Sequence, residues 1–368
     1  MGPPPSSAFD VFGLDDALLH GVADAGFSEP RSIQSQTIPA ALAGRDVLGL
    51  AETGSGKTAA FGLPLLHRIL ATPSDGGARR PRDPRALIIA PTRELASQIA
   101  KELLVLGKHL RPRVVTVYGG VTPKRQVDAL ARGVDVVVAC PGRLLDLCAQ
   151  GEIRLDRVET LVLDEADHMF DMGFLPDVRR ILAKLPRERQ NLLFSATMPE
   201  ELRQLAEGLL RDAVVVERDT QAPAATIEHA IFEVGDKQKI DLLLHLLEGD
   251  ELTSAIVFTR TKHRAKRLAQ KLDALGHRAV ALQGNMAQNA RDRAMQGFRT
   301  RQFEVLVATD IAARGIDVAG VSHVINFDVP NTVDAYTHRI GRTGRAERSG
   351  RAFTFATAED RKMLRAIE

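Results

Sequence analysis

The chain is poor in aromatic residues, cysteine and net charge, and each shortage argues against a class of protein. It has no tryptophan and only 4% aromatic residues, which disfavours a platform of aromatic side chains for stacking bases. Its two cysteines, Cys140 and Cys148, lack C-x-x-C spacing, so we expect neither disulfides nor zinc but small packing residues in a reducing compartment. A net charge of only +2 means that any affinity for nucleic acid comes from local patches. With no long uncharged apolar run and no signal peptide at its start, we expect a cytoplasmic protein without a membrane span.

A glycine-rich segment at residues 51–58 has the composition of a phosphate-binding loop between a predicted strand and a predicted helix. Gly54 and Gly56 permit backbone angles that are closed to other residues, so successive N–H groups can face one anion at the positive end of the helix. Lys57 is expected to reach the β- and γ-phosphates, and Thr58 the magnesium ion. The first position of the segment is alanine, where the usual pattern has glycine. The residues expected to bind the nucleotide here are Thr53, Gly54, Ser55, Gly56, Lys57 and Thr58.

The acidic segment Asp164–Asp167 follows an apolar strand expected at Thr160–Leu163. Parallel-sheet proteins place their chemistry at the carboxyl ends of such strands. Asp164 is expected to hold the magnesium ion, and Glu165 to orient or deprotonate the attacking water. Together with the glycine-rich segment, this cluster predicts an enzyme that cleaves a nucleoside triphosphate.

Strands and helices alternate twice along the chain, and its 368 residues are too many for one ordinary domain. Near-continuous Val, Ile and Leu strands separated by helices predict an α/β fold, with mostly parallel sheets covered by helices on both faces. We expect an N-terminal domain at 1–217, a linker at 218–226 and a C-terminal domain at 227–368. Two of the predicted helices are Thr92–Leu106 and Leu175–Leu185. The predicted strands are Asp46–Leu50, Ala86–Ala90, Val114–Tyr118, Asp135–Ala139, Thr160–Leu163, Asn191–Phe194, Val214–Glu217, Ala230–Val234, Ala255–Thr259, Arg278–Leu282, Val305–Ala308, His323–Phe327 and Ala352–Phe355.

The C-terminal half has no phosphate-binding loop but carries the arginine-rich segment His338–Arg345. Arginines separated by glycines can face a phosphate as arginine fingers. The same pattern also fits a basic loop on a solvated surface, and its spacing leaves both interpretations open. If these arginines serve a nucleotide held by the N-terminal half, the active site is complete only when the domains close, which couples nucleotide state to domain geometry.

A dozen short segments occur in an order that is similar to one family over nearly the whole chain. Besides residues 51–58 and 164–167, they include Gly26–Gln34, Pro91–Leu95, Gly119–Gly120, Pro141–Arg143, Ser195–Thr197, Val257–Thr259, Gln288–Arg291, Ala308–Asp317 and His338–Arg345. On these segments the chain resembles a DEAD-box ATP-dependent RNA helicase of superfamily two, of bacterial type, with Gly26–Gln34 similar to the family's Q motif. The resemblance implies two tandem RecA-like domains.

The resemblance also implies how ATP is bound and coupled to RNA. Gln34 would hydrogen-bond the Hoogsteen edge of adenine, and Phe9 would stack on the same base, so that ATP is preferred over GTP. Phe9 has a second interpretation, as a hydrophobic staple on the first helix. The remaining implied roles are a ribose contact by Asp317, γ-phosphate contacts by Arg342 and Arg345, and coupling of the nucleotide to RNA by Asp167, Ser195 and Thr197.

RNA contacts are implied mostly at strand-end turns and helix starts, where backbone N–H groups meet phosphates without reading bases. Two departures from the family lie beside this track: Cys140, where the family usually has Thr, and Gln283, where many members have His. We expect both to affect RNA binding rather than ATP chemistry. The implied RNA-binding residues are Pro91, Thr92, Arg93, Gly120, Arg143, Gly284 and Thr309.

The expected function is that of an RNA-stimulated ATPase, which uses ATP and Mg²⁺ to unwind or remodel RNA duplexes locally through closure of two domains. Two alternatives stay open: a DNA translocase of the same superfamily, and an ATP-gated RNA clamp with slow turnover. The choice between RNA and DNA depends on 2′-hydroxyl contacts, which a sequence does not show. The chain ends at Arg365–Glu368 soon after its last predicted strand, and we interpret it as a trimmed core whose targeting segments lie outside this sequence.

Overall fold

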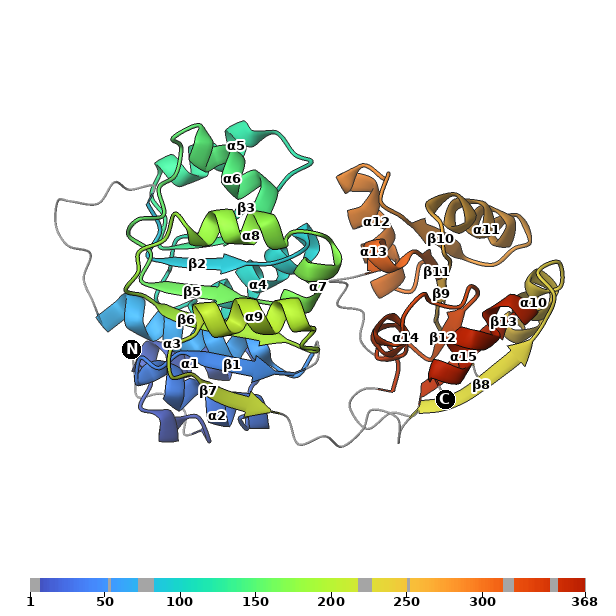
Figure 1. The fold of residues 1–368 in the computed structure, drawn as a ribbon, viewed down its shortest axis with the longest axis horizontal. Helices are drawn as coiled ribbons and strands as arrows, with labels where there is room; N and C mark the ends of the chain where they lie inside the picture. The colour runs from blue at the N-terminus through green and yellow to red at the C-terminus, as the bar shows by residue number, and fades with distance from the viewer. Residues whose placement is uncertain are drawn as a thin grey trace. The chain divides into compact units, whose positions relative to one another are not determined.

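The computed structural model describes residues 7–51, 54–71, 83–217, 227–249, 252–313, 321–344 and 350–367. The chain divides into two compact units, unit 1 at Met1–Asp219 and unit 2 at Thr220–Glu368 (Figure 1). The linker predicted at 218–226 lies outside the described residues. Among the helices that the structure describes, none is both long and apolar enough to cross a membrane.

Unit 1 is built on a seven-stranded sheet in the order β3-β4-β2-β5-β6-β1-β7, and all of its strand pairs are parallel. Its strands are β1 (Val47–Leu50), β2 (Ala86–Ile89), β3 (Val114–Val117), β4 (Val136–Ala139), β5 (Thr160–Leu163), β6 (Gln190–Ser195) and β7 (Val214–Glu217). Its helices are α1 (Asp16–Asp24), α2 (Ser32–Leu42), α3 (Lys57–Ala71), α4 (Arg93–Leu106), α5 (Pro123–Ala131), α6 (Pro141–Ala149), α7 (Ala166–Asp171), α8 (Leu175–Leu182) and α9 (Glu200–Leu209), with a short 3-10 turn at Asp10–Phe12.

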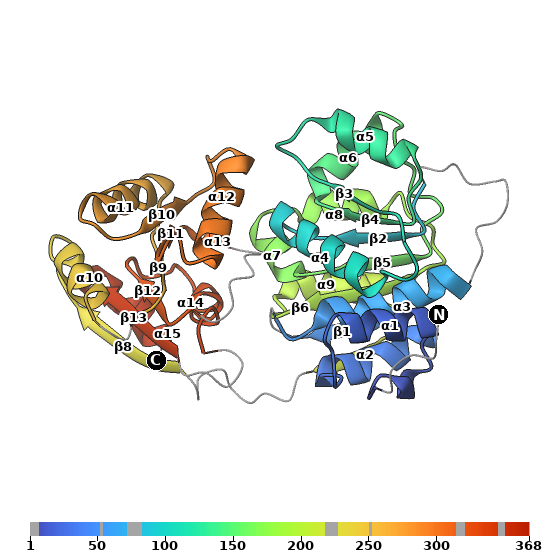
Figure 2. The ribbon, with the colours of Figure 1, turned by 180° about the vertical axis from the view of Figure 1, so that it is seen from behind.

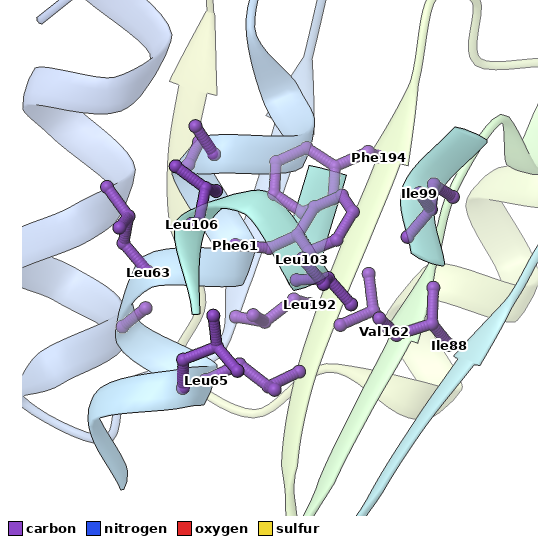
Figure 3. Close-up of a cluster of buried hydrophobic side chains, with 14 of the residues drawn as sticks. Phe61, Leu63, Leu65, Ile88, Ile99, Leu103, Leu106, Val162, Leu192 and Phe194 are labelled. Carbon is purple, nitrogen blue, oxygen red and sulfur yellow. The ribbon is translucent and has the colours of Figure 1, made fainter. Parts of the chain in front are cut away.

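Helices cover both faces of this sheet, and alternate residues of its central strands enter two separate cores. On β2, Ile88 packs with helices α1 to α4, whereas Leu87 packs with helices α5 to α9 on the opposite face. Figures 1 and 2 show the two helical layers from opposite sides. Figure 3 shows part of the first core, where Phe61 of α3 lies against Phe194 of β6. Burial on both faces explains why the strands read as continuous apolar runs.

Unit 2 is built on a six-stranded parallel sheet in the order β10-β11-β9-β12-β13-β8. Helices α12 and α13 share one core with it, and α10 and α11 share a second core. Its strands are β8 (Ile227–Glu233), β9 (Ala255–Phe258), β10 (Ala279–Leu282), β11 (Val305–Ala308), β12 (His323–Asn326) and β13 (Gly350–Ala356). Its helices are α10 (Lys239–Leu247), α11 (Lys262–Ala274), α12 (Gln288–Arg299), α13 (Asp310–Ala313), α14 (Val333–Ile340) and α15 (Arg361–Ile367), with a 3-10 turn at Ala358–Asp360.

The predicted fold class is confirmed, and every predicted strand is present with bounds shifted by no more than three residues. The two predicted helices differ at their ends. Thr92 is the N-cap of α4 rather than its first residue, because its hydroxyl accepts a hydrogen bond from the N–H of Leu95. Helix α8 ends at Leu182, three residues before the predicted end, although Leu185 still packs in the core.

Candidate nucleotide and nucleic-acid site

The strand order of unit 1 sorts the predicted site residues into two groups along one edge of the sheet. Strands β5, β6 and β1 are neighbours, and they are followed by the acidic segment, residues 195–197 and the glycine-rich loop respectively. Strands β3, β4 and β2 form the other half, and they are followed by the segments implied to bind RNA. Since all these strands are parallel, their carboxyl ends meet at the same edge. We call these the β5-β6-β1 half and the β3-β4-β2 half.

The glycine-rich loop joins β1 to α3 in the conformation that its glycines predict. Gly54 and Gly56 have positive φ angles of 84° and 95°, in the region where other residues are strained. Lys57 is the first residue of α3, and its Nζ donates to the carbonyl of Ala51 at 2.8 Å and lies 3.9 Å from Asp164 Oδ1. Thr58 is buried beside it. Thr53, also predicted to bind nucleotide, lies outside the described residues.

Gln34 and Arg31 of the Q-motif-like segment are bonded to this loop. Gln34 is fully buried, and its Nε2 donates to the carbonyl of Gly56 at 3.1 Å while its Oε1 accepts from the N–H of Arg31. Arg31 Nη1 donates to the carbonyl of Gly54 at 2.6 Å. A Cβ at Gly56 would lie 2.6 Å from Gln34 Nε2, so glycine is required here by close approach as well as by φ. No sequence pattern predicts the hydrogen bond from Arg31 to Gly54.

Phe9 is placed differently from its implied stacking role. Its side chain has no exposed surface and belongs to the first core of unit 1, with rings of Phe12 and Phe27 at 5.8 and 6.3 Å between centroids. A ring without exposed surface has no face to offer to a base. The structure therefore supports the packing interpretation of Phe9 over stacking on adenine.

Asp164 and Glu165 follow β5 and are both buried, at 2% and 3% exposure. Burial raises the pKa of the Asp164 carboxyl above its ordinary value, while the positive charge of Lys57 opposes this shift. Glu165 has a positive φ of 52° and is the N-cap residue of α7. Backbone strain of this kind concentrates at functional sites.

Asp167 ties the acidic segment to residues 195–197 by hydrogen bonds. Its Oδ2 accepts hydrogen bonds from the N–H groups of Ala196 and Thr197 and from the Thr197 hydroxyl, at 2.9 to 3.1 Å. The Ser195 hydroxyl in turn accepts from the N–H of Asp167 and donates to the carbonyl of Thr197. These bonds fix the end of β6 to the start of α7.

On the β3-β4-β2 half, two arginines hold the turn that follows β3. Arg93 Nη1 donates to the carbonyl of Gly119 at 2.7 Å, and Arg143 Nη1 donates to the carbonyl of Val121 at 3.1 Å. Gly120 lies between them with a φ of 75°, and a Cβ there would lie 2.2 Å from Arg93 Nη1. Pro91 and Thr92 are buried before α4, where Thr92 is the N-cap. The structure thus brings the implied RNA-binding residues of unit 1 together on neighbouring loops.

Cys140, one of the two departures, precedes α6 as its N-cap residue. No side chain caps this helix, because the thiol makes no capping hydrogen bond. Burial raises the pKa of the Cys140 thiol to about 12. Cys140 is therefore a packed thiol, as the sequence predicted. The Thr that is usual in the family at this position would supply a hydroxyl instead.

In unit 2, Gly284 and Thr309 follow the neighbouring strands β10 and β11, before helices α12 and α13. Gln283, the second departure, uses its Oε1 to accept from the N–H of Asn285 at 2.8 Å, which shapes the turn around Gly284. Arg342 is buried and lines a small pocket with Phe258 and Asp310. Asp317 and Arg345, also predicted site residues, lie outside the described residues.

Arg339 is a residue of the arginine-rich segment whose role the sequence reasoning missed. Its guanidinium forms a bidentate pair with Asp310 at 2.5 and 2.8 Å and donates to Asn326 Oδ1 and the Asp328 carbonyl. It also lies 5.0 Å from the centre of the Phe258 ring. Arg339 therefore holds α14 against the ends of β9, β11 and β12. The position of Arg339 in the same arginine-rich segment as Arg342 was the only feature of the sequence that pointed to a role for it.

Two family models match the chain, one described as DEAD/DEAH box helicase at residues 31–205 and one as helicase conserved C-terminal domain at residues 238–347. The ATP-dependent RNA helicase CshA of Listeria monocytogenes is 44% identical over 361 residues, which is 98% of this chain and 68% of the relative. The DEAD-box ATP-dependent RNA helicase CshA of Bacillus subtilis is 44% identical over 363 residues, which is 98% of this chain and 72% of the relative.

Solved structures agree with these matches. Dbp5 of S. cerevisiae bound to RNA and ADP BeF3 has a TM-score of 0.86 and 32% identity, with 98% of this chain and 93% of that chain covered. A DEAD box protein from Methanococcus jannaschii has a TM-score of 0.55 and 36% identity, with 99% and 96% covered. The phosphate-binding loop, the buried acidic segment and the matches over both units lead to one conclusion: the chain belongs to the DEAD-box family of ATP-dependent RNA helicases.

Proposed function

We propose that this protein hydrolyses ATP to unwind short RNA duplexes locally, with ATP bound on the β5-β6-β1 half of unit 1. The observation that carries the proposal is the meeting of Lys57, Asp164 and the Asp167–Thr197 network at one edge of the sheet. It joins a phosphate-binding loop, a buried carboxylate and a hydrogen-bonded relay within one rigid unit. Bacterial relatives carry the name ATP-dependent RNA helicase, and Dbp5 is bound to RNA and a nucleotide analogue.

The loop residues have distinct roles in this proposal. Lys57 exchanges its bond to the Ala51 carbonyl for the β- and γ-phosphates, where its charge stabilises the transition state. The N–H groups of residues 54–58 would surround the phosphates at the start of α3. Gln34 retains one amide hydrogen and one oxygen lone pair beyond its bonds to Arg31 and Gly56, enough for the adenine edge. Because its side chain has no exposed surface in this structure, the proposed contact requires that the side chain be uncovered when ATP binds.

Mg²⁺ fits the donors beside this loop. Within the described ranges, no group of three or more His, Cys, Asp and Glu side chains could hold a metal ion. Mg²⁺ bound together with ATP needs fewer protein ligands, because one or two protein oxygens and the phosphates complete its coordination. The Thr58 hydroxyl and the Asp164 carboxylate would supply them. The raised pKa of buried Asp164 indicates a carboxylate that lacks full cationic compensation, which a divalent ion would provide.

Glu165 is proposed as the group that orients or deprotonates the attacking water, beside the Mg²⁺ ligand Asp164. The β3-β4-β2 half, together with Gly284 and Thr309 of unit 2, is proposed to bind the RNA backbone. Asp167, Ser195 and Thr197 would then transmit nucleotide binding to the RNA-binding loops. With ATP and RNA bound, Arg342 and Arg345 are proposed to contact the γ-phosphate. The cytoplasm is the proposed location, where bacterial RNA is found.

The test is steady-state ATP hydrolysis without nucleic acid, with single-stranded RNA and with DNA of the same sequence. The Glu165→Gln variant should bind ATP but lose turnover, since the amide cannot accept the proton. Stimulation by RNA alone, with strand separation of a short duplex, is the expected result. Equal stimulation by DNA would instead favour a translocase. Slow phosphate release with long-lived RNA complexes would favour a clamp.

A further inference from the structure

The side chain of Glu165 is held by a histidine that the proposed reaction has not yet used. Glu165 Oε2 lies 2.8 Å from Nδ1 of His168, and both side chains are only 3% exposed. The two residues are three positions apart, Glu165 as the N-cap residue of α7 and His168 as its third residue. Because Glu165 has a φ of 52°, its side chain leaves the main chain in a direction that ordinary helical geometry does not give.

We infer that His168 is a positioning residue for Glu165: it donates the Nδ1 hydrogen to Oε2 and so holds the carboxylate in one orientation. The inference rests on the proposed role of Glu165 in ATP hydrolysis. A carboxylate accepts hydrogen bonds only, so the contact at 2.8 Å requires the hydrogen on Nδ1. This fixes the tautomer of a neutral His168 and orients Glu165.

A positioned carboxylate needs a rigid support, and α7 provides one. The N–H of His168 donates to Asp167 Oδ1 at 3.0 Å, while Asp167 Oδ2 is bound by Ala196 and Thr197. Met169, the next residue, is 2% exposed and packs in the second core of unit 1. His168 thus stands between two anchored residues on one helical turn, and its ring has little freedom to follow Glu165 if that side chain rotates.

The bond matters because both groups are buried. A carboxylate without water around it is poorly solvated, and a charge-assisted hydrogen bond stabilises its ionised form, the form that accepts a proton. Without the donor, Glu165 would lose the contact that fixes the position of Oε2. Misplacing a reacting group by about 1 Å lowers a rate by about a hundredfold, so the effect should fall on kcat rather than on ATP binding.

The test compares four single variants by RNA-stimulated ATP hydrolysis, ATP affinity and thermal unfolding. His168→Leu removes the donor at similar volume, and His168→Asn restores an N–H donor at the position of Nδ1. Met169→Ala loosens the packing of the same helix without touching Glu165. Glu165→Gln reports on the base itself.

We expect His168→Leu to lower kcat by about 10- to 100-fold with KM for ATP within about twofold, and His168→Asn to recover most of kcat. Met169→Ala should lower the unfolding temperature while keeping kcat. The inference is overturned if His168→Leu keeps the wild-type kcat, if His168→Asn is as slow as His168→Leu, or if Met169→Ala loses as much kcat. If Glu165→Gln itself turns over normally, the proposed role of Glu165 fails instead, which separates the two failures.

Discussion

The two units share one architecture but differ in the buried charged side chains around which hydrogen-bond networks form at the ends of their strands. In unit 1 the buried charges that follow the strands include carboxylates, and main-chain N–H groups hold Asp164 and Asp167 in place. In unit 2 the buried charges include Arg339 and Arg342, and acceptor oxygens hold Arg339. Parallel sheets with helices on both faces thus carry the proposed metal and nucleotide site in one unit and the buried arginines Arg339 and Arg342 in the other. Function differs because the strand-end loops differ, while the scaffold does not.

The comparison also shows how each charge is kept buried. A buried charge is tolerated only when it is paired or hydrogen-bonded. Asp167 takes donors from the chain following β6, whereas Arg339 takes acceptors from the chain following β11 and β12. Each network connects two or more strand ends, so a mutation in either should alter more than one loop. The predictions below test the two networks, starting with the largest effect.

The largest effect is expected when the cation of the unit 1 loop is removed. Lys57→Ala should lower kcat/KM for ATP by at least about a thousandfold, or about 4 kcal/mol, because no other described side chain is placed to reach the phosphates from α3. RNA-stimulated phosphate release measures it. Lys101→Ala, an exposed lysine on α4, is the matched control and should keep full activity. A Lys57→Ala protein within tenfold of wild type would contradict the assignment of this loop.

Next in size is the loss of the guanidinium that holds unit 2 together. Arg339→Ala should destabilise unit 2 by about 3 kcal/mol, the low end for a broken buried pair, because Arg339 is 3% exposed but its partner Asp310 is 32% exposed. Two units need not unfold together, so hydrogen exchange resolved by peptide is the suitable measurement. Faster exchange in β9, β11 and β12, with unit 1 unchanged, is expected. Arg365→Ala, an exposed arginine on α15, should change neither unit, and uniform loosening of both units would contradict the role of Arg339.

The corresponding network in unit 1 should affect coupling more than stability. Asp167→Ala removes three acceptor contacts to residues 196–197, so we expect RNA to stimulate ATP hydrolysis about 5- to 150-fold less, equivalent to about 1–3 kcal/mol of coupling. ATP affinity without RNA should change little. Asp128→Ala, an exposed carboxylate on α5, is the control. Equal losses of basal and RNA-stimulated activity would show a structural role instead.

The sequence was sufficient for the fold because burial on both sheet faces left a strong apolar signal. Strands such as Val136–Ala139 are buried along their whole length, and their continuous apolar sequence is typical of strands covered on both faces. The glycine-rich loop and the acidic segment were also predictable, since their chemistry requires those residue types at that spacing.

What the sequence could not show is which side chains meet across the fold. Arg31 bonds the carbonyl of Gly54, and Arg339 bonds residues at the ends of two strands, β11 and β12, yet neither arginine lies in a local pattern that predicts its partners. Phe9 shows the same limit of sequence reasoning. A phenylalanine can stack on a base or pack in a core, and only the complete burial of its side chain in the structure favours packing. Contacts between residues distant in sequence depend on the three-dimensional path, which propensity and periodicity do not encode.

The smallest effect is expected for Arg339→Ala on the two cysteines of unit 1, both on or beside α6, which report on that unit alone. Burial raises the pKa of the Cys140 thiol to about 12 and of the Cys148 thiol to about 11, from an ordinary value of 9.0. Only the thiolate reacts, so at pH 8 alkylation of Cys148 should be about a hundredfold slower than in the unfolded chain, and that of Cys140 about a thousandfold slower.

A raised thiol pKa favours the folded state below pH 9, and this contribution is lost as the pH rises from about 9 towards 11 and 12. Arg339→Ala should leave both rates unchanged, whereas a variant that opens unit 1 should raise them. Equal alkylation rates in folded and unfolded protein would show that the thiols are not buried. Unit 1 could then not serve as the unchanged reference for the effect of Arg339→Ala on unit 2.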